Sequence, residues 1–416
     1  MERLVVTLKT ITPLFLGGAE PDKWAELRAP SIKGAMRFWY RAIDADCNER
    51  VELEKHDSPI WEDKIFGSTK TGRGCFAMRL ENDSIKGGKE WNHDDYPNKN
   101  GIRYLSFSMC MGGKRRRYIP PNTNIGIIII FHHQPNNKEK YSLLASLWLL
   151  GHIGGLGSRS RRGLGTVALQ SWGNCRWDEC NRLKIAHGVK TRDEWWKIFN
   201  DGLNVLKTWF PKPNTVDHSV IDGNTKFFLF GDGKKEWQKA LDEAGIVFQK
   251  FRQRWNLRDT SSDYYRVMEH LASQEPASIK KGSKITPCKI SDSPERVAFG
   301  LPLSFRYNNS LNKIPKKDKS GKPIIDRNTG KPKMEAPNTT FEGEEHDRSA
   351  SPIHIRIVQI EENFYPFYIR LDAPLLENSE QIKDSYGTGY SKPTGKILDT
   401  FWNELKKNNG KEKTWK

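Results

Sequence analysis

Residues 125–169 constrain the fold most strongly, because two uninterrupted apolar segments are followed there by a glycine-rich turn. The segment 125–131 is Ile-Gly-Ile-Ile-Ile-Ile-Phe, which predicts a buried strand. A helix is predicted at about 141–153, and we expect it to be deeply packed because its apolar residues lie nearly all round. A glycine-rich loop and a strand at Gly165–Leu169 follow. These elements close an α/β unit that begins earlier in the chain.

The first half of the chain predicts the order β-α-β-β-α-β, which is that of ferredoxin-like or split β-α-β folds. Ser31, directly after Pro30, is the expected N-cap of the first helix. The stretch 81–101 is polar and rich in glycine and asparagine, which predicts an inserted loop. The other elements predicted in this half are a helix at about 31–47 and strands at 3–11, 75–80 and 102–109.

The second half predicts another α+β domain with a more helical start. Its expected elements are helices at 192–210, 233–255, 263–272 and 395–407 and strands at 227–230, 297–307, 353–360 and 364–371. Residues 308–347 are rich in Lys, Pro, Gly and Asn, which predicts a basic loop that is mobile without a ligand. We expect one domain over residues 1–175 and a second over 176–416.

Composition indicates a globular protein that binds a polyanion. The 416 residues suffice for two domains, and 68 Lys+Arg against 51 Asp+Glu give a formal charge of +17. Charge alone does not choose between nucleic acid, an anionic membrane surface and an acidic protein. The apolar stretches are shorter than the roughly 20 residues that span a bilayer. No secretory signal is visible, so we expect a cytoplasmic protein.

The cysteines predict neither a disulfide framework nor a metal site. Six in 416 residues are too sparse for a framework, which favours a reducing compartment. Cys175, Cys180 and His187 have loose spacing for zinc, and a fourth ligand is missing. We therefore expect two unrelated thiols, no metal and no cofactor.

The first predicted helix carries a row of cations. Lys33, Arg37 and Arg41 recur at i, i+4 and i+8 with no acid between them, so the row gains nothing from local pairing. The row starts in the first turn, where free amides and the helix dipole favour anions. A solvated face is the alternative. We favour binding of an anion, in particular a phosphate.

The loop Gly151–Gly165 holds six glycines and three arginines, Arg159, Arg161 and Arg162, and no acid. Glycine lets a backbone approach a phosphate closely, and arginine offers bidentate donors that match phosphate oxygens. The alternative is a plain turn with an incidental basic tip. The loop follows a helix and enters a strand, which is the reverse of a Rossmann phosphate loop. A Walker A motif is missing as well, so an NTPase is excluded.

A third cationic group is a run of four residues at a predicted turn, which are Lys114, Arg115, Arg116 and Arg117. A solvated tip is the alternative to phosphate contact. Arg162–Leu169 has the spacing of an RNA-recognition core strand, but its aromatic positions hold Leu164, Thr166 and Leu169. We therefore expect no base stacking on that sheet, and binding that is largely independent of sequence and strongly dependent on salt.

Candidates for catalysis are weak. Cleavage of RNA without a metal requires a positioned general base and acid, often histidine. Of the ten histidines, His152 adjoins the glycine-rich loop and is the one to test, although a packed imidazole is the better interpretation. We expect no catalytic residue.

Four segments together resemble a known family: Thr12–Ala19 (TPLFLGGA), Leu27–Ala42 (LRAPSIKGAMRFWYRA), Ile65–Ser68 (IFGS) and Gly154–Gly165 (GGLGSRSRRGLG). They resemble the RAMP superfamily of CRISPR RNA-binding proteins, and in combination the RAMP subunit at the guide 3′ end of type III-B (Cmr) effector complexes. In the second half, Phe299–Leu303 and Arg348–Pro352 resemble that subunit's second RAMP domain.

The resemblance implies two ferredoxin-like domains packed together and no nuclease activity. It further implies contact with guide RNA or a guide–target duplex, beside other RAMP subunits, in antiviral defence. Carried over onto this sequence, the RNA ligands are Lys33, Arg37, Arg41, Arg159, Arg161 and Arg162. The run at 114–117 rests on charge alone. The alternatives are a metal-independent endoribonuclease that processes guide RNA and a basic scaffold that docks acidic partners.

Overall fold

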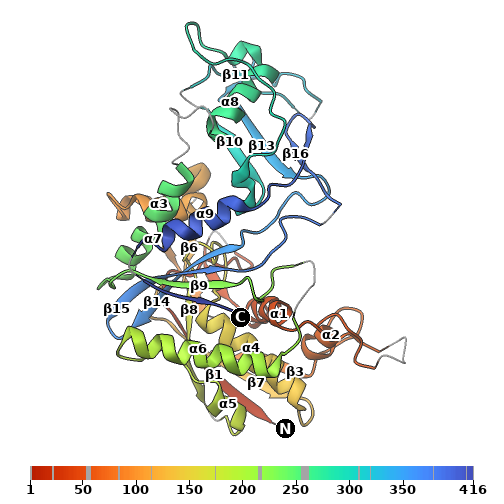
Figure 1. Cartoon of the computed structure of the whole chain (residues 1–416), viewed down its shortest axis with the longest axis vertical. Helices are drawn as coiled ribbons and strands as arrows, with labels where there is room; N and C mark the ends of the chain where they lie inside the picture. The colour runs from red at the N-terminus through yellow and green to blue at the C-terminus, as the bar shows by residue number, and fades with distance from the viewer. Residues whose placement is uncertain are drawn as a thin grey trace. The chain divides into compact units, whose positions relative to one another are not determined.

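A computed structural model describes residues 2–20, 23–52, 58–82, 85–113, 115–173, 175–213, 218–253, 262–307, 310–318, 320–377, 379–408 and 410–415. The chain forms two compact units (Figure 1). The first comprises Met1–Gln249, Pro352–Ala373 and Lys406–Lys416, and the second comprises Lys250–Ser351 and Pro374–Leu405. Each unit has an apolar core of its own.

The first unit begins with a four-stranded antiparallel sheet in the order β3-β7-β1-β8. Helices α1 and α4 pack against it (Figure 1). The predicted order β-α-β-β-α-β is confirmed for this sheet. Its elements are β1 (Arg3–Thr10), α1 (Ala29–Ile43), β3 (Phe76–Leu80), β7 (Asn124–Phe131), α4 (Asn137–His152) and β8 (Val167–Gly173).

The two helices are fixed by different signals. In α1, Ile32, Met36, Trp39 and Ile43 are buried at helical spacing. The helix begins at Ala29, so the prediction of Ser31 as N-cap is wrong: the preferred backbone angles of Pro30 place it in the first turn, and Arg28 is the cap residue. By contrast, α4 starts at a capping box of Asn136 and Glu139 and is buried nearly all round, as predicted.

The region between β3 and β7 differs from the prediction. The expected strand at 102–109 is wrong: the structure has α3 (Asn100–Leu105) and a 3-10 helix, η2 (Phe107–Gly113). Ile102 and Leu105 are both buried, and the spacing of three fits one face of a helix. The backbone amide of Ile102 also donates to Asp242 Oδ1 at 3.2 Å. Part of the expected loop 81–101 is ordered around Trp91, which is fully buried.

Short strands complete this region. They are β2 (Ala25–Leu27) with β4 (Ile85–Gly87), and β5 (Lys89–Glu90) with β6 (Arg117–Tyr118). A 3-10 helix, η1 (His93–Asp95), follows β5, and α2 (Trp61–Phe66) precedes β3.

A second antiparallel sheet of the first unit has the order β14-β15-β9-β18. The predicted strands at 227–230, 353–360 and 364–371 are confirmed, whereas β18 was not predicted. The elements are α5 (Asp178–Arg182), α6 (Arg192–Trp209), β9 (Lys226–Phe230), α7 (Trp237–Gln253), β14 (Ile353–Ile360), β15 (Asn363–Arg370) and β18 (Gly410–Thr414).

Cys175 and Cys180 form a disulfide, so the prediction of two unrelated thiols is wrong.

The second unit is built on a sheet in the order β10-β13-β16-β17. Its core includes Phe305, Tyr307 and Phe341. The segment predicted as one strand at 297–307 divides into η4 (Glu295–Phe299) and β10. The further elements are α8 (Asp263–Gln274), η3 (Pro276–Ser278), β10 (Leu303–Arg306), β13 (Asn338–Gly343), β16 (Ile382–Asp384), β17 (Gly389–Tyr390) and α9 (Lys396–Leu405).

The basic segment expected as a loop contains strands. β11 (Ile314–Pro315) pairs with β12 (Met334–Glu335), and β13 follows. The backbone amide of Lys316 donates to the carbonyl oxygen of Lys333 at 2.7 Å, which continues the ribbon. Two turns are closed by Asp318 and Asp326, whose carboxylates accept from nearby amides. Among the described residues, no helix is long and apolar enough to cross a bilayer.

Candidate nucleic-acid interface

The cation row on α1 has an acidic partner that the sequence did not reveal. Arg37 Nε lies 3.3 Å from Glu62 Oε1, and Arg41 Nε lies 3.7 Å from Glu62 Oε2. Glu62 comes from α2, so the row, which has no acid between its own members, meets one from a neighbouring helix. Helical spacing reveals only neighbours within α1, whereas α2 is brought alongside by the fold. Glu62 thus meets two of the three cations of the row, Arg37 and Arg41.

Aromatic rings support the same row. Lys33 Nζ lies 4.8 Å from the ring centre of Phe76, and Arg37 Cζ lies 5.6 Å from that of Phe66. Burial and the neighbouring Arg37 lower the pKa of Lys33. Arg37 and Arg41 retain 29% and 42% of their side-chain exposure. The two arginines are thus held in place while their guanidinium groups still reach solvent.

The glycines of the loop 151–165 serve close packing of the protein itself. Gly157 has φ of +74°, and a Cβ there would lie 2.1 Å from the carbonyl oxygen of Phe15. A Cβ at Gly154 would lie 2.4 Å from Trp39 Nε1. Both distances are too short for any side chain, so only glycine fits. The expectation that these glycines open the backbone to a phosphate is therefore not needed to explain them.

A buried arginine fixes the loop from inside. Arg356 of β14 donates to the carbonyl oxygens of Gly154 at 2.6 Å and Val167 at 2.7 Å. It also donates to Leu150 and Gly151, at the carboxyl end of α4, where the helix dipole favours a cation. Burial lowers the pKa of Arg356 to about 9, so it stays charged at neutral pH. Sequence reasoning missed this residue, because in β14 it stands among apolar residues with no motif around it.

The three loop arginines diverge. Arg159 Nε donates to Ser108 Oγ at 2.9 Å, which ties the loop to η2. Arg161 Cζ lies 5.2 Å from the ring centre of Phe38 on α1. Arg162 Cζ lies 4.6 Å from the ring centre of Phe248 on α7. The structure therefore brings Arg161 to α1 and Arg159 to the region of the third cationic group, whereas Arg162 points elsewhere.

A cavity of about 190 Å³ lies between α1 and the glycine-rich loop. Phe38 and Trp39 line it from α1, Gly155 and Arg161 line it from the loop, and His354 lines it from β14. Burial lowers the pKa of Arg161 to about 10, so its guanidinium remains positive at neutral pH. The cavity thus joins aromatic rings, a cation and loop backbone within one unit.

The third cationic group combines exposed arginines with one arginine that is paired within the fold. Lys114 lies outside the described residues. Arg115 and Arg116 are exposed. Arg117 lies in β6, where its Nη2 is 2.9 Å from Glu90 Oε1 and its Nη1 donates to the carbonyl oxygen of Gly88. Arg115 and Arg116 are therefore the described residues of this run that are exposed, while Arg117 holds β5 and β6 together.

His152 is held by the backbone on both ring nitrogens. Its Nδ1 donates to the carbonyl oxygen of Trp148 at 2.8 Å, and its Nε2 accepts from the amide of Ala186 at 3.1 Å. Burial lowers the pKa of His152 to about 3, so the ring is neutral. The interpretation as a packed imidazole fits this geometry, since neither nitrogen faces a substrate.

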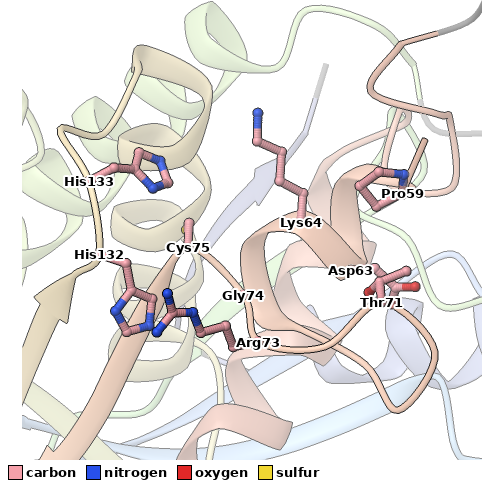
Figure 2. A pocket seen from close by; sticks show the side chains of 9 residues that line it. All are labelled: Pro59, Asp63, Lys64, Thr71, Arg73, Gly74, Cys75, His132 and His133. Atoms are coloured by element: carbon pink, nitrogen blue, oxygen red, sulfur yellow. The ribbon is translucent and has the colours of Figure 1, made fainter. Parts of the chain in front are cut away.

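A second cavity of about 350 Å³ is surrounded by Lys64, Arg73, His132 and His133 (Figure 2). His133 Nε2 lies 3.0 Å from Glu139 Oε2, and Lys64 Nζ lies 3.8 Å from Glu139 Oε1. Sequence reasoning did not select these residues, because two adjacent histidines at the end of a strand carry no motif. Among the described residues, no cluster of three or more His, Cys, Asp or Glu is arranged to hold a metal.

Comparison with known proteins finds a family match in the N-terminal part of the first unit. Residues 7–168 match the model of the RAMP superfamily. The chain carries a RAMP domain. The matched residues include α1, β3, β7, α4, the glycine-rich loop and parts of β1 and β8, and they contain all ten residues predicted to bind RNA. The segments Phe299–Leu303 and Arg348–Pro352 lie outside the match.

Two curated proteins of Pyrococcus furiosus are similar to this chain. "CRISPR system Cmr subunit Cmr1-1" is 29% identical over 39% of this chain and 46% of its own length. "CRISPR system Cmr subunit Cmr1-2" is 29% identical over 41% of this chain and 96% of its own length. The chain thus matches less than half of the first relative.

The fold as a whole is similar to a solved structure. The crystal structure of Cmr1 from Pyrococcus furiosus in its apo form superposes with a TM-score of 0.56 at 16% identity, over 99% of this chain and 98% of that one. The likeness therefore extends beyond the RAMP domain and includes the second sheet and the second unit.

Proposed function

We propose that this chain is a non-catalytic RNA-binding subunit of a type III-B CRISPR effector ribonucleoprotein. Its ligand is the 3′ region of the guide RNA, the guide–target duplex, or both, and its neighbours are other RAMP subunits of the complex. The similarity to two Cmr subunits and to the fold of Cmr1 supports the place in the complex. Antiviral defence is the corresponding biological role.

The contact between the loop and α1 carries the RNA-binding part of the proposal. Arg161 lies 5.2 Å from Phe38, so two basic segments more than 100 positions apart in the chain meet at one place in the RAMP domain. Arg37 and Arg41 remain partly exposed on the same helix. Guanidinium groups on rigid supports suit phosphate oxygens, which predicts binding through the RNA backbone.

Charge changes of opposite sign test this proposal. The double variant Arg37→Gln with Arg161→Gln should weaken binding of single-stranded RNA by more than about tenfold at moderate salt, given about 1.5–3 kcal/mol per charged hydrogen bond. Glu62→Gln removes the acid beside Arg37 and Arg41, and it should strengthen binding by about two- to fivefold at low salt. Fluorescence anisotropy with labelled RNA measures both.

Arg79→Gln is the matched control, because Arg79 is an exposed arginine on β3, a strand of the first sheet. It should leave the affinity within about twofold of the parent protein. Folded variants that all bind RNA as the parent does would overturn the proposal.

A second candidate function is a metal-independent endoribonuclease. The observation that favours it is the cavity of Figure 2, where two imidazoles and two cationic side chains surround one space. An imidazole pair is a suitable acid and base for RNA cleavage, and cations stabilise the phosphate charge that develops. Incubation with a repeat-containing transcript in EDTA separates the two functions. Specific cleavage that is lost in His132→Ala would favour the enzyme.

A further inference from the structure

The cavity between α1 and the glycine-rich loop has features that phosphate binding does not explain. Phe38, Trp39 and His354 bring three rings to its wall. Phe38 and Trp39 meet edge to face with ring centres 5.0 Å apart. The planes of Phe38 and His354 are inclined by only 23°, with centres 6.5 Å apart. A phosphate gains little from such a wall, whereas a flat aromatic ligand packs well on it.

His354 supplies a polar atom that awaits a partner. Its side chain belongs to a residue that is only 5% exposed. Within the part of the chain that the structure describes, no hydrogen-bond donor or acceptor reaches His354 Nε2. Buried polar atoms in folded proteins are rarely unpaired, so an unpaired nitrogen on a residue that lines the cavity points to a ligand.

The imidazole of His354 is uncharged, which suits a hydrogen bond with an uncharged group of a ligand. Burial, and then the neighbouring Arg161 and Arg162, lower the pKa of His354 well below its usual value. The ring is therefore neutral, and its Nε2 donates or accepts one hydrogen bond according to the tautomer. The edge of a nucleobase offers both kinds of partner.

Arg161 connects this wall with the proposed path of the RNA backbone. Its guanidinium lies over the face of Phe38 and also lines the cavity. A volume of about 190 Å³ is below the roughly 300–1,000 Å³ of sites for drug-sized ligands. The space suits one planar ring system with its phosphate outside.

We propose that this cavity receives a single unpaired RNA base, stacked on Phe38, with its edge at His354 Nε2 and its phosphate beside Arg161. The inference rests on the proposed RNA-binding function and deepens it. It also moves base recognition away from the first sheet, whose strand β8 begins with the apolar residues Val167, Ala168 and Leu169. The base is selected by being unpaired, since a paired base cannot leave its helix without cost.

Two ligands with equal phosphate number test this inference. An oligouridylate and an abasic ribose-phosphate oligomer of the same length differ only in their bases. The parent protein should bind the oligouridylate about five- to one-hundredfold more tightly, which is the range for stacking of a base on an aromatic side chain. Phe38→Leu should abolish most of this preference, so that its affinities for the two oligomers become nearly equal.

Two conservative variants guard against a folding defect. Phe38→Tyr should retain the preference, because it keeps the aromatic face. His354→Phe fills the same space without Nε2 and should reduce the preference by about fivefold. Equal affinity of the parent protein for both oligomers would overturn the inference while leaving RNA binding intact. Failure to bind either oligomer would overturn the proposed function as well.

Discussion

At the scale of single residues, Arg356 is the main support of the site. It contacts no RNA in this account, and it positions the loop that carries Arg159 and Arg161. Four carbonyl oxygens, from the end of α4, from the loop and from β8, converge on one buried guanidinium. A lysine offers three donors on a point charge and does not reproduce this planar pattern.

Replacement of this arginine should destabilise the fold. We expect Arg356→Met to lower the free energy of unfolding by at least about 3 kcal/mol, since each buried carbonyl that loses its donor costs about 1–3 kcal/mol. Urea unfolding followed by tryptophan fluorescence measures the change. Arg79→Met, at an exposed position of β3, should shift it by no more than about 0.5 kcal/mol. Equal stability of the two variants would contradict the role of Arg356.

Residue-level prediction from sequence succeeded where the partners are close in the chain. The spacing of Lys33, Arg37 and Arg41 correctly placed them on one α-helix. It did not reveal Glu62, because an ion pair between α1 and α2 depends on the tertiary fold. Arg356 and His354 were missed for the same reason: β14 is far from the loop in sequence and reaches it only in the folded unit.

At the scale of elements, the glycine-rich loop is a packing device that happens to carry arginines. Gly157 combines a positive φ with a close approach to Phe15. Gly188 has φ of +90°, but a Cβ there meets nothing within 4 Å. A side chain at Gly188 would therefore meet backbone strain alone, whereas a side chain at Gly157 would meet both strain and a steric clash.

Alanine at these two glycines should have unequal effects. Gly188→Ala should cost about 1–2 kcal/mol, which is the price of a left-handed backbone for a residue with a side chain. Gly157→Ala should cost about 3 kcal/mol or more, because its Cβ also displaces the segment at Phe15. Thermal unfolding of both variants measures the difference. If Gly157→Ala lowers stability no more than Gly188→Ala does, the claim that the loop packs closely against Phe15 is wrong.

Elements were predictable where periodicity was unambiguous. The run 125–131 and the buried helix at 141–153 were placed nearly at their observed bounds. The segment 102–109 was misassigned because its few apolar residues suit a strand as well as one face of a short helix. The Cys175–Cys180 disulfide was missed because a separation of five residues says nothing about the geometry that brings the sulfurs together.

At the scale of the whole molecule, the excess of +17 is distributed unevenly. Part of it is offset by local acids, such as Glu62 for the α1 row and Glu90 for Arg117. Part remains at exposed positions such as Arg115 and Arg116. The residual positive surface is expected to attract RNA over distance and to make affinity fall steeply as salt rises.

Buried neutral histidines should make the stability of the whole chain depend on pH. The folded pKa of His152 is about 3 and that of His187 about 4, both lowered first by burial. The unfolded chain, with a pKa near 6.5, binds protons that the folded chain does not. Stability is thus fully present above about pH 6.5 and is lost as pH falls towards 4.

The contribution of one of these histidines is measurable as a slope. His152→Gln should reduce the dependence of the free energy of unfolding on pH by about 1.4 kcal/mol per pH unit near pH 5, which corresponds to one proton. Denaturant unfolding at pH 4.5 and pH 5.5 gives this slope for both proteins. An unchanged slope would show that His152 is protonated in the folded state.

The central claim is that RNA lies along α1 and the glycine-rich loop of the RAMP domain. Crosslinking of the full chain to a guide RNA of defined sequence, followed by mapping of the attached peptides, tests it most directly. We predict crosslinked peptides from residues 28–41 and 151–165, and a further one from 115–118. Crosslinks confined to other parts of the chain, for example the basic ribbon at 314–335, would contradict the account.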